Sequence, residues 1–320
     1  MKEITIDIGR AGQRFDKFLS KYLPGMPKSF CYKMLRKKNI TLNQKKAQGN
    51  EILKVGDHIR IFFSDETFQT FSAKPEASAV NYSHVKVVYE DEHVLIVNKP
   101  AGLLSQKAKA EDISLVEEIG SYLRATTVGI EQERLRDYTP GIVNRLDRNT
   151  AGLVVAAKNA AAAEALNRLF REHNLQKFYL CPVNGKVTKS GLLEAHLKKD
   201  TATNTVTIGT CKEDSYIKTG YRPLWMNDRY SLLEVQLFTG KTHQIRAHLA
   251  SIGHPLLGDT KYGDADLNRR IRQTHGIRHQ LLCCYRLVFP EVTGVLAGLS
   301  GREIKIDPPE VFDILRYKGV

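Results

Sequence analysis

The chain has 320 residues, of which 42% are hydrophobic and 26% are charged, and these values are ordinary for a globular protein of about two domains. No apolar run approaches the length of a membrane span, and the first ten residues lack the apolar centre of a signal peptide, so we expect a cytoplasmic protein without a membrane anchor. The formal charge of +13 points to a polyanionic partner, such as nucleic acid or a membrane surface.

The cysteines favour neither a disulfide framework nor a zinc site. Their number is odd, and no two of them form the Cys-x-x-Cys pair that a zinc ribbon requires. We therefore expect reduced and mostly buried thiols at all five positions: Cys31, Cys181, Cys211, Cys283 and Cys284.

Most of the excess positive charge lies in the first fifth of the chain. Residues 14–62 contain twelve lysines and arginines against three acidic residues, which is +9 of the total of +13. Apolar residues at helical spacing predict one helix over residues 15–22, ended by Pro24 and Gly25, and a second helix around residues 30–35. Residues 40–43 and 58–63 read as short strands.

This basic segment resembles the small RNA-binding domain named after ribosomal small-subunit protein number four. The resemblance rests on residues 14–17, 33–43 and 56–57. A lysine run usually forms only a solvated face, but here the charge has one sign and lies where a helix leads into a strand. In the family, the second helix and the following turn lie against structured RNA, which implies RNA contacts by Arg36, Lys37, Lys38, Lys45 and Lys46.

Residues 64–84 show no clear periodicity and are expected to be a linker, which divides the chain into domains 1–63 and 85–320. In the larger domain we expect strands at 85–89, 94–98, 178–183 and 232–237 and a helix at 160–170. Strands and helices do not alternate strictly, so an α+β fold with a mixed sheet is expected rather than a doubly wound one.

Two common catalytic motifs are excluded. Residues 239–242 look like the end of a phosphate-binding loop, but Val235 stands where that motif needs glycine. His243 and His248 are five positions apart, which is not the spacing of a zinc-protease helix. No metal or nucleotide motif remains, so each histidine is expected to be structural or to contact RNA.

The strongest candidate site is the Arg-Leu-Asp triplet at residues 145–147, between two strand-like runs. An isolated aspartate there would most often be a turn former. The whole stretch 141–156, however, resembles the signature of the RluA family of RNA pseudouridine synthases. Three further blocks match that family in order, at residues 87–102, 177–180 and 239–263. One departure is Asn144, since many family members have histidine at this position.

The resemblance implies a fold and a reaction. The fold is a pseudouridine-synthase domain with a mixed, mainly antiparallel sheet flanked by helices. The reaction converts uridine in RNA into its carbon-linked isomer, with no metal or cofactor. Asp147 supplies an ionised carboxylate, as a nucleophile or as a base. Arg246 keeps it charged and oriented, and Tyr179 offers a ring to the base and a hydroxyl for the final proton removal. The expected RNA contacts near this site are Arg145, Lys177, Lys241, His243 and Gln244.

Alternatives remain open at this point. A non-catalytic RNA-binding or ribosome-assembly factor could share the fold, although the presence of Asp147, Tyr179 and Arg246 argues against it. The target RNA could be ribosomal or transfer RNA. Large-subunit ribosomal RNA is favoured, because an added N-terminal domain suits structured RNA, and a monomer without membrane contact is expected.

Overall fold

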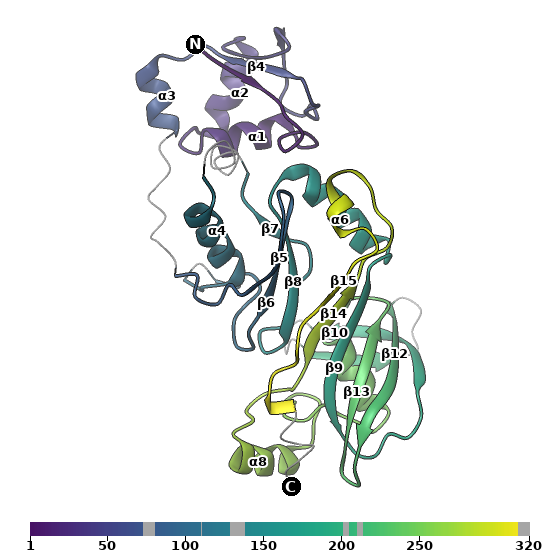
Figure 1. The fold of residues 1–320 in the computed structure, drawn as a ribbon. Coiled ribbons are helices and arrows are strands. Elements are labelled where there is room, and N and C mark those ends of the chain that lie inside the picture. Colours follow the sequence, from purple (N-terminus) through teal and green to yellow (C-terminus); the bar gives the residue numbers. More distant parts are fainter. Residues whose placement is uncertain (73–80, 110, 129–137, 201–204, 210–213, 313–320) are drawn as a thin grey trace.

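A computed structural model describes residues 1–72, 81–109, 111–128, 138–200, 205–209 and 214–312 (Figure 1). A small N-terminal unit lies at the top of this view, and a larger unit with a long sheet extends below it. The α+β architecture with a mixed, mainly antiparallel sheet is confirmed.

The N-terminal unit is built on one four-stranded antiparallel sheet, in the order β1-β4-β2-β3. Phe15, Phe18 and Leu19 are fully buried on one face of its first helix, which confirms the helix predicted from their spacing. The second predicted helix and both predicted strands are also present. The elements are β1 (Lys2–Thr5), α1 (Phe15–Tyr22), α2 (Lys28–Arg36), β2 (Ile40–Leu42), β3 (Lys45–Lys46), β4 (His58–Ile61) and α3 (Asp65–Ser72).

Helix α3 corrects the expected linker. It occupies residues 65–72, and its Phe68 and Phe71 pack against the N-terminal core. The ring of Phe71 lies 5.2 Å from that of Phe30, and its carbonyl accepts a hydrogen bond from the Gly25 N–H. The sequence did not predict this helix, because two phenylalanines among polar residues make a weak periodic signal. Residues 73–80 of the expected linker lie outside the described residues.

The larger unit contains one long sheet in the order β11-β10-β12-β13-β9-β14-β8-β6-β5, with β15 beside β14 and β7 beside β8. Among the described strands only β14 and β8 pair in parallel. Its strands are β5 (Val87–Glu90), β6 (Val94–Lys99), β7 (Gly141–Ile142), β8 (Ala151–Ala157), β9 (Gln176–Asn184), β10 (Gly191–Asp200), β11 (Thr205–Gly209), β12 (Ser215–Met226), β13 (Tyr230–Leu237), β14 (Cys283–Val288) and β15 (Glu303–Lys305). Its helices are α4 (Leu115–Thr126), α6 (Ala160–Arg171), α7 (Gln244–Ser251), α8 (Ala265–His275) and the 3-10 helix η1 (Gly294–Leu299).

Helices cover both faces of this sheet. Successive side chains of a strand point to opposite faces. On β9, Tyr179 and Cys181 join the core cluster that contains α4, α6 and α7, whereas Leu180 joins the cluster that contains α8. Strand β8 is buried throughout, because it lies in the middle of the sheet.

The two units touch at the start of α6. The Ala160 N–H donates to the Gly9 carbonyl at 3.1 Å, and the ammonium group of Lys21 lies 5.0 Å from the ring centre of Tyr138. Phe170, at the other end of α6, lines the cavity described below. The same helix therefore contacts the N-terminal unit and the candidate site.

Gly152 permits the parallel pairing of β8 with β14. Its φ is +116°, and an added Cβ would lie 2.2 Å from the carbonyl oxygen of Cys284. We expect Gly152→Ala to destabilise the fold by more than about 4 kcal/mol, because backbone atoms cannot move aside. Gly253→Ala is the matched control, since Gly253 also has a positive φ but no atom within 4 Å of its Cβ position, so about 1 kcal/mol is expected. Urea unfolding of both variants measures the difference, and equal losses would contradict this packing argument.

The described cysteines match the expectation of reduced, buried thiols. Cys31, Cys181, Cys283 and Cys284 are free and buried, and Cys211 lies outside the described residues. Among the described helices, none is long and apolar enough to cross a membrane.

Candidate active site

A cavity of about 810 Å³ opens where five segments of the larger unit meet. This volume lies in the range of small-molecule sites. The segments are the turn before β8, strand β9, the end of α6, the turn before α7 and residues 104–108. Asp147, Tyr179 and Arg246, which the sequence analysis selected from three distant blocks, all line this cavity.

Asp147 is placed by the segment that joins β7 to β8. The Thr150 N–H donates to the Asp147 carbonyl at 3.0 Å, which closes the polar turn. Three residues before the aspartate, the Asn144 amide donates to the Leu153 carbonyl at 3.1 Å and accepts from the Val155 N–H at 2.8 Å. Strand β8 pairs with β14 at residues 151–152 and with β7 at residues 156–157. The Asn144 amide supplies hydrogen bonds to the backbone of β8 between these two paired stretches.

Two groups brace this turn from the other side. The ammonium group of Lys99 is fully buried and donates to the carbonyls of Pro100, Leu103 and Arg148, at 2.7–3.0 Å. Burial lowers the pKa of Lys99 to about 8. The Ser105 hydroxyl donates to the Leu146 carbonyl at 2.7 Å. The loop after β6 is thus tied directly to the residues on either side of Asp147.

The turn before α7 brings the other charged groups to the cavity. His243 adopts the left-handed conformation, with φ of 55°, and directs the chain into the helix. The buried Gln244 amide holds this turn, since its oxygen accepts from the Lys241 N–H and its nitrogen donates to Thr219. Arg246 follows within the first turn of α7.

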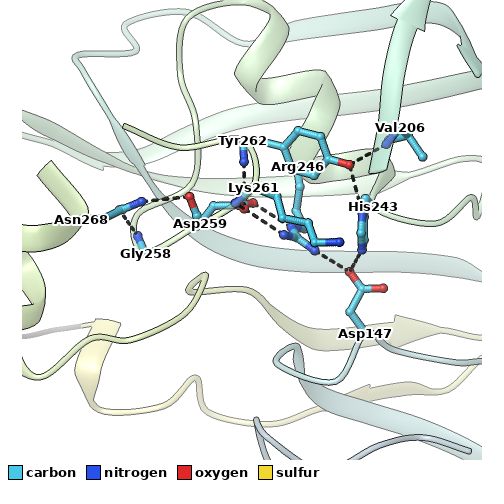
Figure 2. A network of polar contacts seen from close by, with 9 residues as sticks. All are labelled: Asp147, Val206, His243, Arg246, Gly258, Asp259, Lys261, Tyr262 and Asn268. Atoms are coloured by element: carbon cyan, nitrogen blue, oxygen red, sulfur yellow. Dashed lines mark hydrogen bonds and ion pairs between the residues drawn. The ribbon is translucent and has the colours of Figure 1, made fainter. Parts of the chain in front are cut away.

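Arg246 lies between two carboxylates (Figure 2). It binds Asp259 through two hydrogen bonds, at 2.7 Å from Nε and 2.8 Å from Nη2, and its Nη1 lies 3.3 Å from Oδ2 of Asp147. Burial alone would raise the pKa of Asp259, but Arg246 and two backbone N–H groups outweigh it and lower the pKa. Arg246 is therefore a fixed cation, and its remaining face is presented to Asp147.

Tyr179 lines the cavity as a neutral phenol. The residue is only 7% exposed, and it pairs with Cys284 across strands β9 and β14. Burial, and then the neighbouring Cys284, raise the pKa of Tyr179 well above its usual value. It can present a flat ring to a base and can donate a proton.

The remaining predicted RNA contacts fall into three groups: basic residues that line the cavity, buried residues before and within α7, and basic residues of the N-terminal unit. Arg145 and Lys241 are exposed on the cavity wall. Lys177 also lines the cavity but is only 7% exposed, and burial lowers its pKa. His243 and Gln244 are buried among protein groups. A third group, far along the chain, is exposed on the N-terminal unit around α2, β2 and β3 and comprises Arg36, Lys37, Lys38, Lys45 and Lys46.

Three site residues received no role from sequence analysis: Lys99, Asp259 and Tyr262. All three lie within the matching blocks, but their roles depend on partners that are distant in the chain or across a turn. The only sequence signal was a charged or aromatic residue beside glycine or proline. No group of three or more histidine, cysteine or acidic side chains suited to a metal occurs within the described residues.

Known proteins resemble this chain in sequence and in fold. The family model described as RNA pseudouridylate synthase matches residues 93–251, and the S4 domain matches residues 13–59. Ribosomal large subunit pseudouridine synthase C of Vibrio cholerae is 32% identical over 267 residues, which cover 82% of this chain and 80% of that protein. An uncharacterized RNA pseudouridine synthase of Mycoplasma genitalium is 31% identical, with 88% and 86% of the two chains covered. A solved human protein, RNA Pseudouridylate Synthase Domain Containing 4, has a TM-score of 0.56 and 19% identity and covers 71% of this chain and 90% of its own, which is a likeness of fold.

Fold and sequence together define an isomerase that acts on RNA and carries an added RNA-binding domain of the S4 type. The chain belongs to the RNA pseudouridylate synthase family. The resemblance to this family and to the small RNA-binding domain is confirmed, with matches at residues 93–251 and 13–59.

Proposed function

We propose that this enzyme isomerises specific uridines of large-subunit ribosomal RNA and that Asp147 is its catalytic group. The observation that carries the proposal is the contact of the Asp147 carboxylate with a guanidinium that a second, buried carboxylate fixes in place. Relatives from Vibrio cholerae and Escherichia coli that are named ribosomal large subunit pseudouridine synthase C support the choice of RNA.

The chemistry follows from the groups around the cavity. Arg246 directs its guanidinium at Oδ2 of Asp147, and the carboxylate so oriented can attack the substrate or remove a proton from it. Tyr179 lines the same cavity and can stack with a uracil ring that has left its helix. Arg145 and Lys241 are exposed on the wall, where they can bind the phosphates on either side of the target.

The N-terminal unit is proposed to supply affinity. We place the end of the N-terminal unit after α3, since Phe71 packs against the core of that unit. The synthase domain is placed at residues 85–320. Five exposed basic side chains surround α2, β2 and β3, and phosphate contacts dominate the binding of RNA by such surfaces. The cytoplasmic location and the monomeric state stay predictions.

Changing Arg36, Lys37, Lys38, Lys45 and Lys46 to glutamine is expected to weaken the salt dependence of RNA binding. Each phosphate contact contributes about 0.7 to 0.9 to the slope of log affinity against log salt concentration. If about four of the five side chains contact phosphates, the slope falls by about three. A salt titration of binding to cellular RNA measures it, and the rate at saturating RNA is expected to change little, because the cavity is intact.

The matched control removes the same charge from the synthase domain. Arg269, Arg270, Arg272, Lys186 and Lys189 are also exposed, and α8, which carries the three arginines, lies at the opposite end of the molecule (Figure 1). Their replacement by glutamine is expected to leave the slope within about one of the wild-type value. Equal slopes in the two variants would mean that the basic N-terminal surface is only solvated.

A further inference from the structure

Among the described residues, two side chains contact the proposed catalytic carboxylate, and both contacts are to the same oxygen (Figure 2). Oδ2 of Asp147 lies 3.3 Å from Nη1 of Arg246 and 3.8 Å from Nε2 of His243. No hydrogen bond or ion pair to Oδ1 occurs within the part of the chain that the structure describes. The two oxygens of one carboxylate are therefore in different environments.

His243 is held by a chain of hydrogen bonds that begins in β11. The Val206 N–H donates to the hydroxyl of Tyr262 at 2.8 Å, and that hydroxyl lies 3.0 Å from Nδ1 of His243. Tyr262 packs in the small core between α7 and the strands β10 to β12, so the hydroxyl is fixed. His243 is only 8% exposed, which leaves its ring little freedom to turn.

One arrangement of protons satisfies every member of this chain. An ionised carboxylate only accepts hydrogen bonds, so Nε2 must carry the proton to face Oδ2 favourably. In a neutral imidazole the other nitrogen, Nδ1, is then an acceptor, and the Tyr262 hydroxyl must donate to it. The Tyr262 oxygen keeps a lone pair for the Val206 N–H. Burial lowers the pKa of His243 and, together with the nearby Arg246, outweighs the opposite effect of the Asp147 carboxylate, in agreement with a neutral ring.

We propose that His243 is a positioning residue for Asp147: its Nε2–H, oriented by Tyr262, acts with Arg246 to hold Oδ2, so that Oδ1 is the oxygen presented to the substrate. The proposal rests on the assignment of Asp147 as the catalytic group. A separation of 3.8 Å is longer than a hydrogen bond, and such contacts shorten when the substrate fills the site. His243 is then a part of the catalytic constellation and not the RNA contact that the sequence suggested.

The test compares four full-length variants on one substrate. The substrate is RNA from cells that lack this protein, labelled with tritium at carbon 5 of uridine, since isomerisation releases that tritium. His243→Ala removes the donor, and His243→Gln keeps an N–H close to the position of Nε2. Tyr262→Phe removes only the hydroxyl and keeps the ring that lies 5.2 Å from Arg246. The fourth variant combines His243→Gln with Tyr262→Phe, and thermal unfolding confirms that each variant is folded.

We expect His243→Ala to lower the rate at saturating RNA by roughly ten- to a hundred-fold, a cost typical of a misplaced reacting group. The RNA concentration at half-maximal rate should stay within about two-fold, because no contact to RNA is removed. His243→Gln should restore most of the rate. Tyr262→Phe should lower the rate in the wild-type background and should have little effect beside His243→Gln, because a glutamine amide has no tautomer for Tyr262 to select.

Three outcomes would overturn the proposal. They are a normal rate in His243→Ala, a loss that lies wholly in the half-saturating RNA concentration, or an equal effect of Tyr262→Phe in both backgrounds. Failure of the proposed function is distinguishable, since wild-type protein would then release no tritium, or Asp147→Asn would release it normally.

Discussion

Replacing Asp147 by asparagine is expected to abolish isomerisation and to leave RNA binding within about a few-fold of the wild-type value. Asparagine keeps the shape of the side chain but removes the charge that Arg246 faces and the oxygen that can attack or accept a proton. Loss of a group that reacts directly costs on the order of 10⁴-fold or more in rate. Tritium release from uridine labelled at carbon 5 measures the rate, and a filter assay measures binding.

The control for this variant is Asp228→Asn. The Asp228 side chain is 99% exposed and forms a pair with Lys186 at 3.5 Å, so its replacement should change neither quantity. A near-normal rate in Asp147→Asn would remove Asp147 from the chemistry. It would also favour the alternative of an RNA-binding or assembly factor on the same fold.

The second large effect is expected from Asp259→Asn. Asp259 is completely buried and is the main partner of Arg246, whose side chain is only 5% exposed. Removal of one partner from a buried ion pair leaves an uncompensated charge and costs about 3 to 5 kcal/mol. The free energy of unfolding should fall by that amount. The rate should also fall, because the guanidinium can then turn towards Asp147 and no longer has a fixed direction.

Two measurements separate these effects. Urea unfolding measures the loss of stability, and tritium release, measured without urea on folded protein, measures the loss of rate. The matched control is Asp266→Asn, which breaks the exposed pair of Asp266 with Arg269, and this change should cost less than about 1 kcal/mol. Equal stability losses for the buried and the exposed pair would contradict the role of Asp259 as the support of Arg246.

Sequence alone predicted the elements whose burial pattern is sharp. Helices α1 and α2 have apolar residues on one face and basic residues on the other, and β6 is an apolar run. Strands β11 and β12 and helix α8 received no prediction, because few of their residues are fully buried and their burial pattern is therefore weak. In α8 only Leu267 and Ile271 are buried, although Asp264 at its start and Gly276 after its end are recognisable capping signals.

The site shows the same division. Asp147, Tyr179 and Arg246 could be selected because each lies in a block that resembles the family. The support of Arg246 by Asp259 could not be predicted, because it depends on how the chain returns after α7 to bring a carboxylate against the guanidinium. His243 and Gln244 were expected to contact RNA, because they lie in the last block that resembles the family. Their burial results from the strands that cover α7.

Because Asn144 does not titrate, the hydrogen bonds that hold the turn before Asp147 do not depend on pH. Its amide accepts from the Val155 N–H and donates to the Leu153 carbonyl, and neither atom of the amide titrates. A histidine at this position would gain a second N–H on protonation and could no longer accept from Val155. In this chain the strand edge that carries the aspartate therefore keeps the same hydrogen bonds in weakly acidic and in neutral solution.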